Sequence, residues 1–205
     1  GRGEQILKTD QDNALLLRDG FDLPGLADVA QRFNAALLTF GYPACPGNIM
    51  VTNPQWRQHA GTFRETLRQW LYGELPEAPM HLAIFLDARA VAGDATLLHQ
   101  ARKHLHGIAS GSDASLARFA SAIDQFSEPS GWWARITALR DRDDATIDIK
   151  KLGTFPIVHG MRALALQYHL TELGTVERMR TLVNLGHLDR DLARDLTDTL
   201  YFLMG

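Results

Sequence analysis

The sequence is short of several features that mark particular classes of protein. Its 205 residues contain one cysteine, so no disulfide can form within the chain, and a reducing compartment is expected. No uninterrupted apolar run reaches the length of a membrane-spanning helix, and no signal peptide opens the chain. Internal repeats and low-complexity segments are also lacking. We therefore expect a cytoplasmic protein that has no membrane partner.

Excess positive charge is lacking as well. The formal net charge is -3, so the bulk charge does not indicate a nucleic-acid partner. The last two predicted helices, joined at Gly186, have the outline of a DNA-binding helix-turn-helix. However, the final helix carries several aspartates that would repel a phosphate backbone, namely Asp189, Asp191, Asp195 and Asp198. A helical bundle without nucleic acid is the better prediction.

Two aspartates near the start of the chain form the clearest candidate site for a metal ion. Asp10 and Asp12 lie just before an apolar run over residues 14–17, which predicts a buried strand. Alternate residues of a strand share a face, so both carboxylates are expected to project to the same side. Adjacent carboxylates repel each other unless a divalent cation takes ligands from both, and Mg²⁺ does so while keeping positions for water and phosphate. The pattern therefore predicts a magnesium site.

The Asp-x-Asp pair has other interpretations. Such pairs are frequent in solvated turns, and the pair alone leaves that alternative open. An EF-hand loop is excluded because Ala14 replaces a ligand and Leu15 replaces the glycine that this loop requires. A phosphatase-type nucleophile would end a strand, whereas here the apolar run follows Asp10.

The segment before the pair has the composition of a phosphate-binding turn. It begins with Gly1, Arg2, Gly3 and Glu4, and Lys8 follows. The backbone amides of a glycine-rich turn can hold phosphate oxygens, and the two basic side chains add positive charge. We therefore predict that this segment takes part in binding a nucleotide.

The whole opening phrase is far more specific than its parts. Gly-Arg-Gly-Glu at residues 1–4, with Asp-x-Asp at residues 10–12, resembles the nucleotidyltransferase motif of the bacterial PII-protein uridylyltransferases, which belong to the polymerase-β-like superfamily. Residues 3–15 are still more similar to a putative nucleotidyltransferase family of bacterial signal-transduction proteins that also carry cyclic-nucleotide-binding and CBS domains. In those relatives a helix and a Gly-Ser pair precede the motif. The resemblance thus implies a piece of a longer polypeptide with regulatory domains upstream.

Hydrophobic periodicity predicts short strands and a larger number of helices. Apolar runs predict strands at residues 14–17, 48–52 and 81–89. Helical spacing predicts helices over residues 26–40, 53–71, 94–108, 116–126, 155–166, 175–185 and 188–203. On the first of these, six residues form an apolar face expected to lie on the sheet: Leu26, Val29, Ala30, Phe33, Leu37 and Phe40.

The predicted fold class is α+β. The resemblance implies a polymerase-β-like nucleotidyltransferase domain at residues 1–108, with a small mixed sheet, flanking helices and an incomplete amino-terminal end. A helical bundle at residues 109–205, similar to a substrate-binding domain, is expected to follow.

Asp87 ends the third predicted strand. A carboxylate in an apolar run is costly to bury alone, so a metal ion or Arg89 is expected beside it. The resemblance to polymerase-β-like enzymes implies a third carboxylate that completes the metal site and helps to activate the attacking hydroxyl, and Asp87 is the candidate. A structural pair with Arg89 and a helix cap stay open as alternatives.

Two further segments match the same family. Residues 43–47 and 53–57 are similar to the loop and strand that flank its expected active site, which makes Arg57 a candidate for nucleotide or acceptor binding. A solvated helix charge is the alternative for Arg57. Cys45 has no histidine close in sequence and is interpreted as a small packed side chain rather than a reactive thiol.

A phrase in the carboxy-terminal part, residues 148–157, matches the family pattern Asp-x-Lys-x-x-Gly-x-x-Pro-Ile. A lysine beside the nucleotidyl site could hold the triphosphate, because displacing pyrophosphate develops negative charge there. Lys150 is the candidate for this role. A structural pair of Asp148 with Lys150 stays an equal alternative.

The resemblance implies a nucleotidyltransferase that moves a nucleoside monophosphate from an NTP to an unknown acceptor, either a protein or a small molecule. Asp10 and Asp12 would hold Mg²⁺, with Asp87 as the third ligand or the base. The competing hypothesis is a non-catalytic regulatory or protein-interaction module that binds nucleotide. Both aspartates of the pair are intact, which favours the enzyme.

Overall fold

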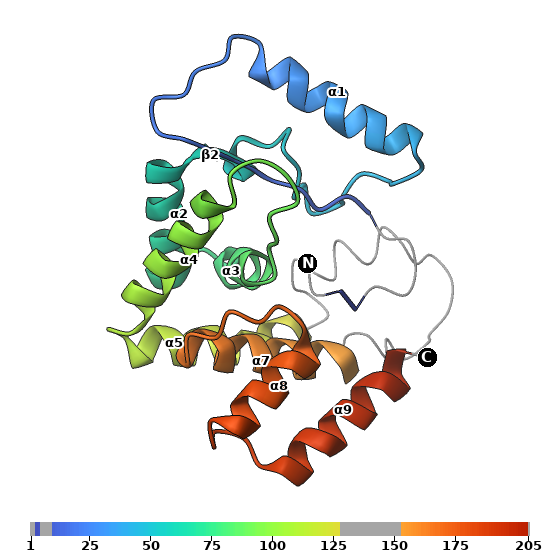
Figure 1. The fold of residues 1–205 in the computed structure, drawn as a ribbon, viewed down its shortest axis with the longest axis vertical. Coiled ribbons are helices and arrows are strands. Elements are labelled where there is room, and N and C mark those ends of the chain that lie inside the picture. The colour runs from blue at the N-terminus through green and yellow to red at the C-terminus, as the bar shows by residue number, and fades with distance from the viewer. Residues whose placement is uncertain (1–2, 5–9, 128–152, 205) are drawn as a thin grey trace. The chain divides into compact units, whose positions relative to one another are not determined.

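The computed structural model describes residues 3–4, 10–127 and 153–204 (Figure 1). Within these residues the protein is α+β, with a two-stranded parallel sheet and eight α-helices. The chain divides into two compact units. The sheet unit comprises residues 5–67 and 90–105, and the helical unit comprises residues 1–4, 68–89 and 106–205. In the described part of the chain, no helix is both long and apolar enough to cross a membrane.

The sheet consists of two short parallel strands. β1 (Leu15–Leu17) pairs with β2 (Arg57–His59), so that Leu15 lies opposite Arg57. The strand predicted at residues 14–17 is confirmed as β1. It is less buried than predicted, because Leu15 is 36% exposed and the other two residues are partly exposed.

The strand predicted at residues 48–52 is wrong. These residues form turns, although Ile49 and Val51 are buried, which accounts for their apolar pattern. The carbonyl of Ile49 and the amide of Val51 both bond to Asn13, and the carbonyls of Val51 and Thr52 accept from Arg57. Contacts with these two residues, and not a β-ladder, hold the segment. The single helix predicted at residues 53–71 is also wrong in part. The segment forms a 3-10 helix η1 (Pro54–Trp56), strand β2 and helix α2 (Ala60–Tyr72).

Helix α1 (Leu26–Thr39) is confirmed, but the prediction that its apolar face packs on the sheet is largely wrong. Ala30 is buried, whereas Val29 is 52%, Phe33 47% and Phe40 71% exposed. Two strands of three residues offer little surface for a helix to cover. The other buried residue of α1 is polar, Asn34, and its contacts help to hold the helix in place.

Residues 81–89 form no strand. Most of this apolar run lies in helix α3 (Ala78–Leu86), which begins with Pro79 in its first turn and is buried on nearly all sides. A short continuous apolar run is compatible with either a buried strand or a buried helix, since periodicity cannot separate the two. Proline is favoured in the first turn of a helix, where its missing N–H has no intrahelical partner to lose.

Helix α4 (Ala95–Ala109) begins as the sequence predicts. The side chain of Asp94 accepts hydrogen bonds from the amide of Thr96 at 3.0 Å and from its hydroxyl at 2.6 Å. A carboxylate in this position satisfies an amide that has no partner within the helix. The cap is reinforced by Arg18, which donates to Asp94 at 2.9 Å.

Among its described residues, the helical unit has four further helices, whose predicted positions are confirmed: α5 (Asp113–Ser127), α7 (Phe155–Gln167), α8 (Thr175–Asn184) and α9 (Arg190–Met204). α3 and α5 pack on α7, α7 packs on α8, and α8 packs on α9 (Figure 1). One apolar cluster joins the last three helices through Met161, Met179, Leu182 and Ala193. This cluster gives the carboxy-terminal helices a common core.

Helix α8 begins at Thr175, the residue at which the sequence predicts its start. Gly174 occupies the N-cap position. Glu177 then stands three residues after the cap, and its carboxylate accepts from the amide of Gly174 at 3.3 Å. Glu177 is therefore the acidic residue of a capping box. Arg178, one position later, takes no part in this cap.

Candidate functional site

Asp10 and Asp12 lie in the sheet unit, on the segment that leads directly into β1. Asp12 is exposed and Asp10 is partly exposed, whereas Gln11 between them is only 4% exposed. The amide of Gln11 donates to the carbonyl of Pro43 at 2.9 Å. Burial alternates along residues 10–12, as expected of an extended segment in which alternate side chains point to the same side. The two carboxylates therefore share the solvent-facing side.

Gln11 fixes this segment to its surroundings. Its side-chain amide donates to the carbonyls of Asn34 at 3.1 Å and of Tyr42 at 3.0 Å, and its oxygen accepts from the side chain of Asn34. Buried amides are stable only when their donors and acceptors are satisfied. Gln11 thus ties the aspartate pair to α1 and to the loop that follows this helix.

Asn13 fixes the segment on its other side. Its backbone amide donates to the carbonyl of Ile49 at 3.0 Å, and its side-chain oxygen accepts from the amide of Val51 at 2.9 Å. The residues at positions 11 and 13 therefore serve as supports, while those at positions 10 and 12 remain at least partly accessible to solvent.

Cys45 lies beside the candidate metal site. Its thiol hydrogen-bonds to the carboxylate of Asp12, and burial together with the negative charge of Asp12 raises the pKa of this thiol to about 12. The thiol is therefore protonated at neutral pH and acts as a donor to the carboxylate. The contact between Cys45 and Asp12 could not be predicted from the sequence, because only the folded loop around Cys45 brings the two residues together.

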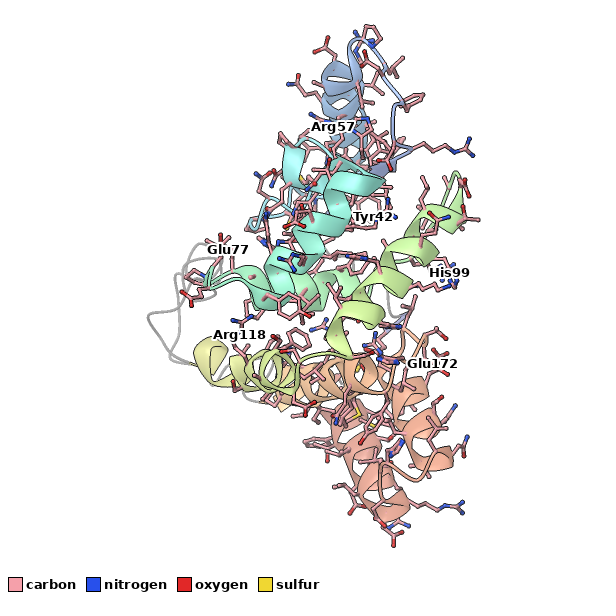
Figure 2. The ribbon with its side chains drawn as sticks, turned by 90° about the vertical axis from the view of Figure 1, so that its left-hand side faces the viewer. Tyr42, Arg57, Glu77, His99, Arg118 and Glu172 are labelled. Carbon is pink, nitrogen blue, oxygen red and sulfur yellow. The ribbon has the colours of Figure 1, made fainter. Side chains whose placement is uncertain are left out.

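Arg57 lies in strand β2, so the alternative of a solvated charge on a helix is wrong. Its guanidinium donates to the carbonyl of Val51 at 2.6 Å and to that of Thr52 at 3.4 Å. Figure 2 shows Arg57, with Tyr42, among the side chains of the sheet unit. Arg57 thus braces the same turn that Asn13 holds, and its role in binding a nucleotide or acceptor stays a prediction.

The donor set of the aspartate pair fits Mg²⁺. Its carboxylate oxygens are hard ligands, and the exposure of Asp12 leaves one side of the pair open to solvent. Within residues 3–4, 10–127 and 153–204, no three His, Cys, Asp or Glu side chains gather closely enough to hold a metal ion. Mg²⁺ commonly binds through only one or two carboxylates and takes its other ligands from water and substrate phosphates.

Several predicted binding residues lie outside the described residues, namely Gly1, Arg2, Lys8 and Lys150. Glu4 is described and belongs to the helical unit. Its carboxylate accepts hydrogen bonds from the amide and the hydroxyl of Thr175, at the start of α8.

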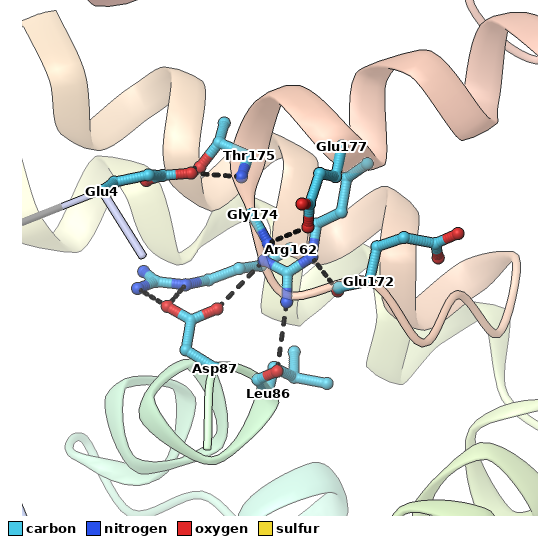
Figure 3. A network of polar contacts seen from close by, with 9 residues as sticks. Glu4, Leu86, Asp87, Arg162, Glu172, Gly174, Thr175 and Glu177 are labelled. Carbon is cyan, nitrogen blue, oxygen red and sulfur yellow. Dashed lines mark hydrogen bonds and ion pairs between the residues drawn. The ribbon is translucent and has the colours of Figure 1, made fainter. Parts of the chain in front are cut away.

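Asp87 lies in the helical unit, at the C-cap of α3, where it forms a buried ion-pair network (Figure 3). One carboxylate oxygen accepts from the Nε of Arg162 at 3.0 Å and from its Nη2 at 2.5 Å. The other oxygen accepts from the Nη1 of Arg178 at 3.0 Å. Since Asp87 occupies the C-cap position of α3, the alternative that it lies at a helix end is confirmed. The metal role of Asp87 stays a prediction.

Arg178 is the most deeply buried charged residue of this network, with 1% exposure. Besides Asp87, its guanidinium donates to the carbonyl of Leu86 at 3.1 Å and to that of Glu172 at 2.9 Å. The end of α3 is thereby held against α7 and α8. These partners could not be predicted from the sequence, because Asp87 is 75 residues from Arg162 and 91 from Arg178.

Fold and site together define an α+β protein with an accessible carboxylate pair before a parallel strand and a helical region that follows in the chain. Residues 1–77 match the family model described as putative nucleotidyltransferase DUF294, and residues 113–205 match the model described as putative nucleotidyltransferase substrate binding domain. The chain belongs to this family of putative nucleotidyltransferases, which confirms the resemblance to such a family that residues 3–15 carry. No curated protein and no solved structure matches the chain.

Proposed function

We propose that this protein is a Mg²⁺-dependent nucleotidyltransferase that moves a nucleoside monophosphate from an NTP to a protein or small-molecule acceptor. Membership of the family supports the reaction class. The observation that carries the metal site is the pair Asp10 and Asp12, accessible to solvent on either side of the buried Gln11. A polymerase-β-like fold for the sheet unit and a role in bacterial signalling belong to the same proposal and rest on the sequence resemblance.

In this proposal the two aspartates bind the metal and the surrounding residues orient them. A divalent cation held there would neutralise charge on the departing pyrophosphate and favour deprotonation of the acceptor hydroxyl. Gln11 and Asn13 hold the segment through buried hydrogen bonds, so the carboxylates are preorganised before a substrate arrives. The protonated thiol of Cys45 restricts the orientation of the Asp12 carboxylate without adding charge.

Metal binding is tested with Mn²⁺, a paramagnetic ion that suits the same oxygen ligands as Mg²⁺. We expect the full chain to bind Mn²⁺, measured as loss of the free-ion signal in electron paramagnetic resonance, and Mg²⁺ to compete. The variant Asp10→Asn/Asp12→Asn should lose this binding. The matched control is Asp22→Asn, an exposed aspartate in the loop between β1 and α1. Equal Mn²⁺ binding by the double variant and the control would contradict the proposed site.

A further inference from the structure

Two histidines of the helical unit, from helices far apart in the sequence, lie against each other. His106 is in the last turn of α4, and His169 follows the end of α7. Their imidazole rings have centroids 5.2 Å apart and planes inclined by 21°. His106 is partly exposed and His169 is exposed, so an ion in solution can reach the pair.

Ser110, just after the end of α4, fixes the tautomer of His169. Its hydroxyl donates to the carbonyl of His106 at 2.8 Å, and its Oγ lies 2.9 Å from the Nε2 of His169. A hydroxyl has one hydrogen to donate, and the carbonyl of His106 receives it. The Oγ therefore accepts a hydrogen bond from Nε2–H of His169. In a neutral imidazole with its proton on Nε2, the lone pair that can bind a metal ion is on Nδ1.

The backbone of His169 adopts an unusual conformation for this residue type. Its φ is 56°, in the left-handed region that glycine commonly occupies at the end of a helix. The amide of His169 donates to the carbonyl of Leu166 at 3.4 Å. The next amide, of Leu170, donates to the carbonyl of Ala165 at 2.8 Å, which completes a Schellman motif. Glycine would suit this position better, so the imidazole is expected to contribute something that glycine cannot.

The separation of the two rings suits a pair of imidazoles on one metal ion. With zinc–nitrogen bonds of about 2.1 Å and a tetrahedral angle at the metal, the ring centroids lie about 5 Å apart. His106 must turn about χ2 to direct a nitrogen at the ion, and this torsion is soft in histidine. Among the described residues, no third His, Cys, Asp or Glu joins the pair, so water would complete the coordination. Imidazole ligands suit Zn²⁺, whereas Mg²⁺ prefers oxygen.

We propose that His106 and His169 form a binding site for Zn²⁺, with Nδ1 of His169 as one ligand and Ser110 as the residue that holds the tautomer of this ligand. The site uses none of the residues of the aspartate pair, which belongs to the sheet unit. A bound ion would link the end of α4 to the end of α7, and α7 lies in the range that matches the substrate-binding model. The inference is therefore independent of the proposed function.

The test is calorimetric titration of the full chain with Zn²⁺ at about pH 7.5, where imidazole is mostly neutral. Mg²⁺ is present in excess to occupy sites made of oxygen ligands. The unaltered chain should bind Zn²⁺, and Ser110→Ala should weaken this binding about tenfold, because a group that orients a ligand is removed. His106→Gln and His169→Gly each remove a ligand and should weaken it by more than about tenfold.

His169→Gly separates the loss of a ligand from the loss of the fold. Glycine adopts the left-handed conformation without strain, so the end of α7 should be kept and the thermal unfolding midpoint without zinc should change little. The matched control is His99→Gln, an exposed histidine on the same helix as His106, which should keep the zinc affinity.

Long-range proton–nitrogen NMR of the imidazoles gives a second readout. The signals that disappear in His169→Gly identify His169. They should show the Nε2–H tautomer without zinc and a shift of Nδ1 with it. An Nδ1–H tautomer at His169 would overturn the inference, as would an unaltered chain that binds no Zn²⁺.

Two further results of the titration would also overturn it, namely unchanged zinc affinity in His169→Gly and an equal loss of affinity in His99→Gln. Zinc binding should persist in Asp10→Asn/Asp12→Asn, so failure of the proposed function leaves this site unaffected. Loss of the zinc-dependent shift of His169 in that double variant would contradict a site made by the two histidines.

Discussion

At the scale of single residues, Asp87 is a buried carboxylate that pairs with two buried arginines, Arg162 and Arg178. Both arginines come from helices far along the sequence. Replacing one member of a buried ion pair is strongly destabilising, because the remaining charges lose their partner but stay out of water.

We predict that Asp87→Asn lowers the free energy of unfolding by about 3–5 kcal/mol. The measurement is urea denaturation followed by circular dichroism. Glu74→Gln, at an exposed position of the same unit, is the matched control and should change stability by less than about 0.5 kcal/mol. Similar values for the two variants would show that the network contributes no net stability.

The candidate metal ligands could be predicted from the sequence, but the residues that hold them in place could not. Asp10 and Asp12 stand out because they precede an apolar run and belong to an opening phrase that resembles a known family. Gln11 and Asn13 attract no attention, since amides in a polar segment are ordinary, and only the folded loop brings them to Asn34 and Val51. Supports of this kind depend on tertiary contacts that a single sequence does not display.

At the scale of elements, helix α4 depends on a cap that is sensitive to acid. Bonds from Thr96 and from Arg18 lower the pKa of Asp94 from 3.8 to about 2. A carboxyl whose pKa is lower in the folded state stabilises that state above its unfolded pKa. Its contribution is lost as the pH falls from about 4 through about 2.

We predict that Asp94→Asn flattens the fall in thermal unfolding midpoint between about pH 4 and pH 2. Asparagine caps a helix as well as aspartate does, so the helix is kept while the titrating group is removed. The control is Asp198→Asn, an exposed aspartate on α9. An unchanged pH profile in Asp94→Asn would show that another group governs stability in this range.

Helix α1 supplies a second prediction at this scale. Phe33 is 47% exposed, so its truncation opens no cavity in a packed core. Phe33→Ser should cost less than about 1 kcal/mol, whereas Leu67→Ala, at a fully buried position of α2, should cost about 2–5 kcal/mol. Urea denaturation compares the two. A cost for Phe33→Ser equal to that of Leu67→Ala would mean that the apolar stripe of α1 is covered.

The helices were more predictable than the strands. α1, α4, α5, α8 and α9 have polar faces that reveal the helical period. α3 has none, because it is buried nearly all round, and its apolar run was therefore taken for a strand. β2 could not be predicted, since Arg57–His59 is a short polar segment that is ordered by pairing with β1.

At the scale of the whole molecule, the compact units and the family ranges divide the chain differently. Residues 68–77 match the nucleotidyltransferase model but belong to the helical unit, as do Gly3 and Glu4. Residues 78–112, which contain the whole of α3 and α4, lie between the two matched ranges. Asp87 is in this interval, and its bonds to Arg162 and Arg178 link it to the substrate-binding range.

The most direct test of the central claim is calorimetric titration of the protein with ATP, GTP, CTP and UTP, each with and without Mg²⁺. We predict binding of at least one NTP that requires Mg²⁺, is retained in Asp22→Asn and is lost in Asp10→Asn/Asp12→Asn. The NTP that binds would identify the base. Binding that persists in the double variant, or an unaltered chain that binds none of the four, would contradict a nucleotidyl-transfer site at this pair.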